Sequence, residues 1–236
     1  MANVYVGGKS KKRGKTWLIF IIIIVAVAAF FGFMFYKYKN LTSSPVITSD
    51  KITYTISYND DLYYVRILNN NRKIMILKVE NGTTFPGPYI TLTSNNLEKA
   101  TTDFLKLFEL NSNFNYHFYL NDALANELTN KLSGSSMQGI DGLFNSLKTN
   151  KISFWKVFSY KSYVKTVKEY DRNTNLDEEG FVALIKGFSQ YAITNYDKLT
   201  IPTLLNQPII VNIGAQSIER KYANPDAFLR IKEILE

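Results

Sequence analysis

An uninterrupted apolar run near the N-terminus constrains this chain more than any other feature. The residues from Trp17 to Tyr36 include no charged side chain and no proline. About 20 residues at about 1.5 Å rise each make a helix about 30 Å long, which matches the hydrocarbon thickness of a bilayer. The rings of Trp17 and Tyr36, one at each end, favour the membrane–water interface. The run therefore predicts one membrane-spanning helix over residues 16–37.

The charges beside this run predict its orientation. Only Lys37 and Lys39 follow it closely, whereas five basic residues precede it: Lys9, Lys11, Lys12, Arg13 and Lys15. Basic flanks stay in the cytoplasm, so we expect a cytoplasmic tail over residues 1–15 and an extracytoplasmic C-terminal domain. A cleaved signal peptide is the alternative, because Ala26-Val27-Ala28 resembles a cleavage site. Apolar residues continue through Phe35, which favours a retained single-pass anchor in the cell membrane.

Composition excludes several classes of function for the remainder of the chain. The net charge is +8, but seven of the 28 Lys and Arg residues precede residue 40. The rest carries 21 basic and 20 acidic residues, so nucleic acid is not an expected partner. The chain has no cysteine, which excludes disulfides and thiol chemistry. Its single histidine, His117, excludes a multi-histidine metal site.

Residue patterns divide the chain after the anchor into a polar spacer, residues 38–50, and one domain, residues 51–236. Period-two alternation predicts strands over Ile52–Tyr58, Asp61–Leu68, Arg72–Val79, Asn115–Leu120, Ile152–Tyr160 and Pro208–Ile213. Helical spacing predicts helices over Asn95–Leu110, Ala123–Leu132, Ile140–Leu147, Glu178–Tyr196 and from Asn224 to Leu235. This order of elements predicts an α/β or α+β domain with a central mixed sheet flanked by helices.

Two groups of charged residues are candidates for ligand binding. Lys161, Lys165 and Lys168, with Arg172, place four cations within 12 residues and could meet an anionic polymer or a lipid headgroup. A solvated helix face is the simpler interpretation of that group. Asp60-Asp61 could supply oxygen ligands to a divalent cation. A turn before a strand explains that pair better, so we expect no metal site, with Asp61 as the one weak candidate.

The order of elements resembles the LytR-CpsA-Psr family of bacterial envelope proteins. A basic tail and one anchor lead into Ile52–Tyr58, then Asp61-Leu-Tyr-Tyr-Val-Arg-Ile, a turn, and Lys73-Ile-Met-Ile-Leu-Lys-Val. A loop ending in Thr83, two helices and an intervening strand follow. The resemblance spans about residues 50–200. It implies an exported α/β domain that transfers glycopolymers from a lipid pyrophosphate carrier to the cell wall.

The chain departs from this family where the chemistry should lie. The family's Pro-Arg-Asp-Thr loop is here Glu80-Asn81-Gly82-Thr83, so only Thr83 agrees, while Asp61 matches the family's acidic residue. The family also has an arginine-rich stretch before its long C-terminal helix, and Arg172 is the one arginine of that stretch in this chain. Arginine forks neutralise pyrophosphate, and their loss removes that stabilisation. The resemblance therefore implies a non-catalytic member with no catalytic residue and no cofactor, Mg²⁺ being needed only if the site is active.

Three functions remain open at this stage. The first is a membrane-anchored extracytoplasmic scaffold or binding module whose ligand residues are Asp61, Thr83, Lys161, Lys165 and Arg172. Its expected partners are membrane lipid, envelope proteins, or a lipid-linked or cell-wall polymer. The alternative is an assembly component of a secretion or conjugation machine, with long helices on one face of a strongly curved antiparallel sheet. An active glycopolymer phosphotransferase is the third.

Overall fold

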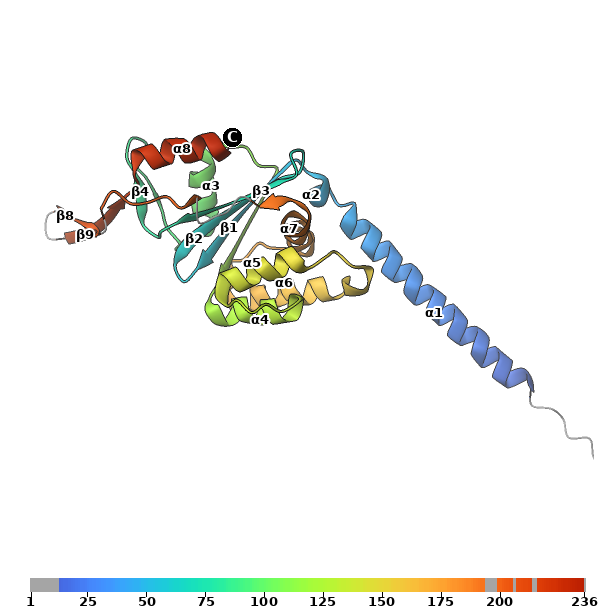
Figure 1. Ribbon diagram of the computed structural model, residues 1–236. Coiled ribbons are helices and arrows are strands. Elements are labelled where there is room, and N and C mark those ends of the chain that lie inside the picture. Colours follow the sequence, from blue (N-terminus) through green and yellow to red (C-terminus); the bar gives the residue numbers. More distant parts are fainter. Residues whose placement is uncertain (1–12, 194–198, 206, 214–215, 236) are drawn as a thin grey trace, which may run out of the picture.

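A five-stranded mixed sheet forms the centre of the domain in this computed structural model (Figure 1). β1 (Lys51–Tyr58), β2 (Asp61–Leu68) and β3 (Lys73–Val79) form an antiparallel meander. β6 (Phe114–Leu120) pairs parallel with β1, and β7 (Ala192–Ile193) pairs parallel with β3. The strand order is β6-β1-β2-β3-β7. The structure describes residues 13–193, 199–205, 207–213 and 216–235.

A second, smaller sheet lies beside the first. It contains β4 (Thr83–Phe85), β5 (Ile90–Leu92), β8 (Ile209–Ile213) and β9 (Gln216–Tyr222) in the order β5-β4-β9-β8. β4 pairs antiparallel with β5 and parallel with β9, so this sheet is also mixed. This sheet therefore joins segments about 140 residues apart in sequence.

Helices cover both faces of the central sheet (Figure 1). α3 (Leu97–Leu107) and α8 (Pro225–Leu235) cover what we call the α3 face. The opposite face, called the helical face, is covered by four helices: α4 (Asp122–Leu132), α5 (Gly139–Thr149), α6 (Ser159–Tyr170) and α7 (Glu178–Gln190). The predicted fold class is therefore confirmed: an α+β domain with a mixed sheet flanked by helices, following one apolar N-terminal helix.

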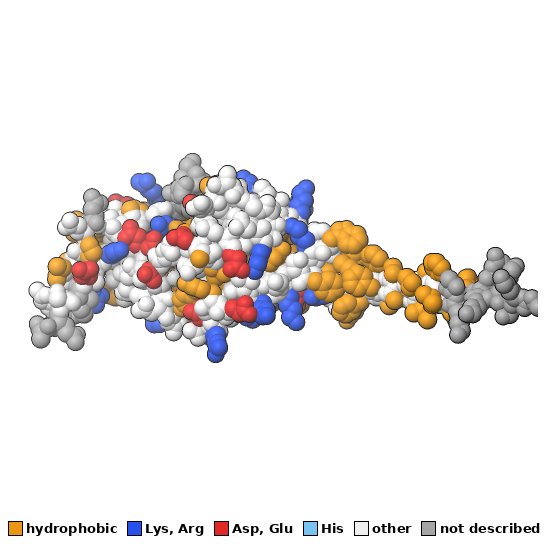
Figure 2. Space-filling view, turned by 90° about the horizontal axis from the view of Figure 1, so that it is seen from below, with side chains coloured by type: hydrophobic (Ala, Val, Ile, Leu, Met, Phe, Trp, Pro, Cys, Tyr) orange, Lys and Arg blue, Asp and Glu red, His pale blue; other side chains and the backbone are white. Residues whose placement is uncertain are grey.

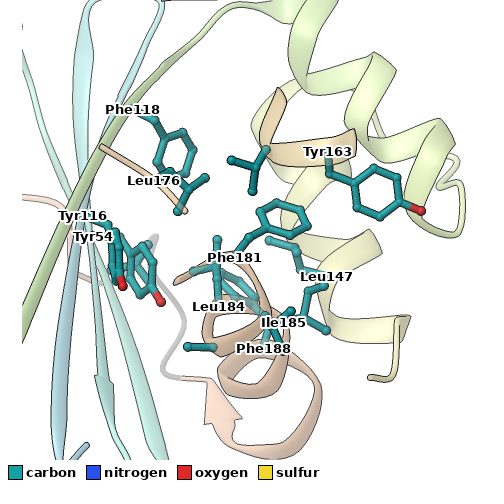
Figure 3. Packing of buried hydrophobic residues seen from close by; sticks show 14 of the residues in the cluster. Tyr54, Tyr116, Phe118, Leu147, Tyr163, Leu176, Phe181, Leu184, Ile185 and Phe188 are labelled. Carbon is teal, nitrogen blue, oxygen red and sulfur yellow. The ribbon is translucent and has the colours of Figure 1, made fainter. Parts of the chain in front are cut away.

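Aromatic side chains fill the space between α7 and the sheet (Figure 3). Tyr54 and Tyr116 stack with ring centroids 5.3 Å apart, and the Tyr54 hydroxyl donates to the Gly180 carbonyl at 2.7 Å. A Cβ on Gly180 would lie 2.6 Å from the Tyr116 ring. Gly187, two helical turns further, approaches Ile67 just as closely. The two glycines let the α7 backbone approach the Tyr116 and Ile67 side chains of the sheet closely.

The apolar helix α1 (Arg13–Thr42) projects away from the domain (Figure 1). Within the described residues it alone is long and apolar enough, from Trp17 to Thr42, to cross a membrane by length and composition. Almost none of its central window is buried, unlike the core helix of a soluble protein. Residues 1–12 of the predicted basic tail (residues 1–15) lie outside the described residues. The helix predicted over residues 178–196 ends at Gln190, and residues 194–196 of that prediction lie outside the described residues.

The segment predicted as a polar spacer is packed structure instead. α1 continues to Thr42, and a short helix α2 (Pro45–Thr48) follows with Ser44 as its N-cap. Leu41 and Ile47 are buried in the core of the helical face, and Lys186 of α7 donates to the Ile47 carbonyl at 3.0 Å. The few apolar residues of this segment are spaced among polar ones, so the local pattern predicted a spacer. Their burial depends on α7, which lies more than 130 residues away in sequence.

The prediction of a strand over Ile152–Tyr160 is wrong. The segment forms a 3-10 turn, η1 (Phe154–Lys156), and the first residues of α6. Its alternating aromatic residues suggested a period of two. The buried positions of the longer segment recur instead every three or four residues, which is helical spacing. These buried residues are Val157, Tyr160, Tyr163, Val164 and Val167.

Candidate functional site: a cationic groove on helix α6

A groove of about 490 Å³ runs along the outer side of α6. The apolar face of α6 packs on α7, where Tyr163 and Phe181 are in ring contact at 5.7 Å. Lys161, Lys165 and Lys168 fall on the opposite, exposed face of the helix, and Arg172 lies in the loop that follows its last residue, Tyr170. We call this site the α6 groove, and it is lined by Lys161, Val164, Lys165, Lys168, Glu169, Arg172, Asp177 and Glu178.

The cations of the α6 groove are mostly free of carboxylate partners. Lys165 forms an exposed ion pair with Glu169 at 3.4 Å, one helical turn away. In the part of the chain that the structure describes, no carboxylate lies within ion-pair distance of Lys161, Lys168 or Arg172. An exposed pair of this kind contributes little energy, so Lys165 can exchange its partner for a ligand. The groove can therefore accept an anion carrying more than one charge.

The acidic wall of the groove is already engaged by the protein. Asp177 is the N-cap of α7, where its side chain accepts the Gly180 N–H at 2.7 Å. Glu178 pairs with Lys37 of α1 at 3.1 Å. An acidic first turn stabilises the positive end of the helix dipole. These two carboxylates are therefore partly neutralised, which leaves the α6 lysines to set the potential of the groove.

The loop between α6 and α7 is fastened to strand β6. The His117 backbone N–H donates to the Asn175 side chain at 2.6 Å, and the His117 ring contacts the Asn173 carbonyl at 2.9 Å. Asn175 in turn donates to the Asn115 carbonyl at 3.0 Å. These bonds fix the chain between Arg172 and α7, so the groove has a rigid end. The only histidine thus has a positioning contact beside the site.

The groove opens next to the apolar helix α1. Lys37, which pairs with Glu178, also lies 5.0 Å from the centre of the Phe158 ring at the start of α6. Seen from below, hydrophobic side chains gather where α1 meets the domain, with Lys and Arg side chains on the adjoining domain surface (Figure 2). Trp17 and Tyr36, the predicted interface residues of α1, are 70% and 64% exposed.

Asp61 and Thr83 lie together at a separate place, the corner between β2 and β4. The Asp61 carboxylate pairs with Lys78 at 2.9 Å and accepts the Asn81 N–H at 3.4 Å. The hydrogen bond with Asp61 raises the pKa of Lys78. Thr83 is fully buried and donates to the Glu80 carbonyl at 2.7 Å. Both residues therefore stabilise the turn, and neither lines the α6 groove.

The five candidate ligand residues are thus divided between two places. Lys161, Lys165 and Arg172 line one groove, while Asp61 and Thr83 serve the β2–β4 corner. Across the described residues, no group of three or more His, Cys, Asp or Glu side chains is placed to hold a metal ion. Sequence reasoning missed Lys37 as a neighbour of the site. Its position just after the apolar run gave no signal of a contact with residue 178.

Comparison with known proteins extends this description. No protein-family model matches the chain, and no curated protein matches it. A crystal structure of residues 52–321 of Lmo1026 from Listeria monocytogenes, titled as a transcriptional factor, aligns with a TM-score of 0.50 and 8% identity. The alignment covers 81% of this chain and 96% of that one. At this identity the likeness shows the fold alone.

Two structures of TagT align over similar lengths. One, titled as a LytR-CPS2A-psr family protein with bound octaprenyl pyrophosphate lipid, has a TM-score of 0.46 and 8% identity over 80% of this chain and 90% of that one. The other, titled as bound to LIIa-WTA, has a TM-score of 0.48 and 10% identity over 82% and 92%. The predicted resemblance to the LytR-CpsA-Psr family is confirmed as a likeness of fold at low sequence identity.

Proposed function

We propose that this chain is a single-pass membrane protein of the cell envelope whose α+β domain binds an anionic, lipid-linked or cell-wall polymer without transforming it. The α6 groove is the binding site in this proposal. Residues 1–15 lie in the cytoplasm, α1 spans the membrane, and the domain lies on the other side.

The α6 groove is the observation that carries the proposal. It joins four cations to an apolar floor at Val164, and its Glu178 wall contacts α1 through Lys37. A phosphate or pyrophosphate group on a lipid would meet both features, because its charge needs cations and its lipid chain needs apolar contact. A soluble anion would have no reason to prefer a groove beside the membrane anchor.

The β2–β4 corner supports a binding role over catalysis. Asn81 and Gly82 stand where the resemblance expects arginine and aspartate, and Asp61 is held by Lys78. Transfer of a phosphoryl group needs charge stabilisation aimed at the transition state. Here the one carboxylate of the pattern is already paired within a turn, so the corner has little charge to offer a reacting group.

The alternative of a secretion-machine component is less well supported. That class was expected to show several long helices on one face of a strongly curved antiparallel sheet. The central sheet is mixed, with parallel pairs at both edges, and helices cover both of its faces. An active phosphotransferase stays an outcome of the experiment below.

The binding test uses the full chain in lipid nanodiscs, titrated with farnesyl pyrophosphate in the presence of Mg²⁺ by calorimetry. We expect saturable binding that Lys165→Glu with Arg172→Glu weakens at least about tenfold, because two attractive charges become repulsive. Lys106→Glu, on exposed α3 surface at the opposite face, is the matched control and should bind normally. Equal affinity in the groove variant would remove the site, and release of inorganic phosphate would remove the non-catalytic claim.

The topology is tested separately, and the absence of cysteine makes the test clean. Single cysteines are introduced as Asn70→Cys in the exposed β2–β3 turn and as Ser10→Cys in the basic tail. Intact cells are then treated with a membrane-impermeant maleimide. Labelling of the first variant alone is the expected result. Labelling of the second alone would reverse the orientation, and labelling of neither would place the whole chain inside.

A further inference from the structure

The segment between α5 and α6 exposes a cluster of aromatic side chains, which we call the aromatic loop (residues 152–158). Trp155 is 70% exposed and Phe158 is 40% exposed. The ring of Phe154, in the same loop, contacts Tyr38 of α1 at 5.9 Å. Large apolar side chains grouped on a surface mark a contact site for a protein or a membrane.

Hydrogen bonds and one buried side chain hold the backbone of the aromatic loop in place. The Ser153 N–H donates to the hydroxyl of Tyr160 at 3.0 Å, and Val157 is completely buried in the core. Lys156 donates to the Leu132 carbonyl at 3.0 Å, which ties the loop to α4. The interior residues thus hold the backbone, and the exposed rings are presented outward at little cost in conformational entropy.

The exposed rings lie against the outer half of α1. The Trp155 ring meets Phe31 edge-on at 5.9 Å, and Phe158 stacks with Phe30 and Phe33 at 6.3 and 6.0 Å. These contacts cover only part of the two loop rings. Trp155 stays 70% exposed, although its ring lies beside residues of the apolar run.

The position along α1 gives the depth of the loop. Phe30 and Phe33 precede Tyr36, the expected interface residue, by six and three positions, which is about 9 and about 4.5 Å of helix. Interfacial segments bury their apolar side to about this depth, at the boundary between headgroups and acyl chains. Lys37, one residue after Tyr36, lies over the Phe158 ring at 5.0 Å, so a cation adjoins the exposed rings on the side of the domain.

We propose that the aromatic loop inserts into the outer interface of the bilayer that α1 spans, giving the domain a second attachment to the membrane. This inference rests on the proposed anchor. The partner of the aromatic loop is lipid, because the exposed rings continue the apolar surface of α1 and lysines adjoin them. The loop leads into α6, so insertion would hold the α6 groove at the level of the lipid headgroups.

The two tryptophans of the chain provide the test, because one reports on each attachment. Trp17→Phe leaves Trp155 as the only tryptophan, and Trp155→Phe leaves Trp17. Each full-length variant is reconstituted in vesicles that contain lipids brominated near the top of the acyl chain. A third variant places the fluorophore at exposed Tyr89 (Y89W with both natural tryptophans replaced by Phe), as a control for non-specific quenching.

We expect Trp155 emission to fall by about half in brominated vesicles and to be shifted to the blue, as for other interfacial tryptophans. Trp17 should be quenched as well, and the fluorophore at position 89 should not. Quenching of Trp17 without quenching of Trp155 would overturn the loop insertion and leave the anchor intact. Absence of quenching at Trp17 would overturn the anchor, and the insertion with it.

Discussion

The two faces of the central sheet are built in opposite ways. On the α3 face large side chains meet: the Tyr64 and Phe104 rings stack at 3.9 Å, and Phe108 contacts Phe85 and Phe228. On the helical face two glycines of α7 let a backbone lie on the sheet. The α3 face should therefore be sensitive to lost volume and the helical face to added volume. The face with the tightly docked helix also supports the groove and the aromatic loop.

Phe104→Ala should give the largest effect on the α3 face. Phe104 is fully buried between Tyr64 and Phe108, and its removal leaves a cavity that rigid aromatic neighbours cannot fill. We expect a loss of about 3–5 kcal/mol in the free energy of unfolding. Denaturant titration of the detergent-solubilised chain measures it. Leu105→Ala, partly buried on the same helix, should lose clearly less, and equal losses would argue against a tightly packed face.

Alkaline pH should weaken both faces because burial raises the pKa of several tyrosines, among them one test residue on each face. Burial raises the pKa of Tyr54 on the helical face and of Tyr64 on the α3 face well above 10. The unfolded chain ionises near pH 10 while the folded chain stays neutral, so stability falls as pH rises above 10. Each such tyrosine can cost about 1.4 kcal/mol per pH unit above that value.

Removing the Tyr54 and Tyr64 hydroxyls one at a time compares how much each face contributes to the alkaline loss of stability. Tyr54→Phe and Tyr64→Phe should each flatten the alkaline decline seen in thermal melts between pH 9 and 11. Burial lowers the pKa of Arg66 to about 10, so this residue acts in the opposite direction above that pH. A decline unchanged in both variants would place the titrating groups elsewhere.

Gly180→Ala should cost about 1–3 kcal/mol on the helical face, because the new methyl group overlaps the stacked Tyr116 ring. The same substitution at Gly32 of α1, with nothing within 4 Å, is the control and should be neutral or slightly stabilising. Denaturant titration compares the two. If Tyr116→Leu restores the stability of the Gly180 variant, the clash with that ring is the cause.

Arg66→Met should give the smallest effect, with the opposite sign. Arg66 is 2% exposed and its guanidinium donates only to the Thr53 hydroxyl at 3.3 Å and to the Asn111 carbonyl at 3.4 Å. Its burial carries a desolvation penalty that these long bonds repay in part, so we expect a gain of about 1 kcal/mol. Arg230→Met, exposed on α8, should change nothing. A loss at Arg66 would show that its hydrogen bonds outweigh its desolvation.

Local sequence signals predicted the elements well where periodicity was strong. The β1–β2–β3 meander, α3, β6, α4 and the start of α8 lie at or near their predicted positions. The prediction was wrong at Ile152–Tyr160, where aromatic residues contact α1 and so imitate strand alternation. It was also wrong for the spacer, where burial of Leu41 and Ile47 depends on α7.

The candidate site divided in the same way. The sequence placed four cations on one segment; the exposed face of α6 gathers the three lysines because their spacing is helical, and Arg172 follows in the next loop. It could not show that Asp61 and Thr83 would serve a different corner, since that depends on Lys78 and Asn81 meeting Asp61.

The sequence by itself determined the apolar helix, the strand meander and the basic face of α6, because each depends on residues a few positions apart. Only the tertiary structure decided that Lys37 meets Glu178, that Trp155 meets Phe31, and that α7 rests on Tyr116 through Gly180. Such contacts join positions more than 60 residues apart. They form when burial of apolar surface selects one packing among many, and no local pattern encodes that choice.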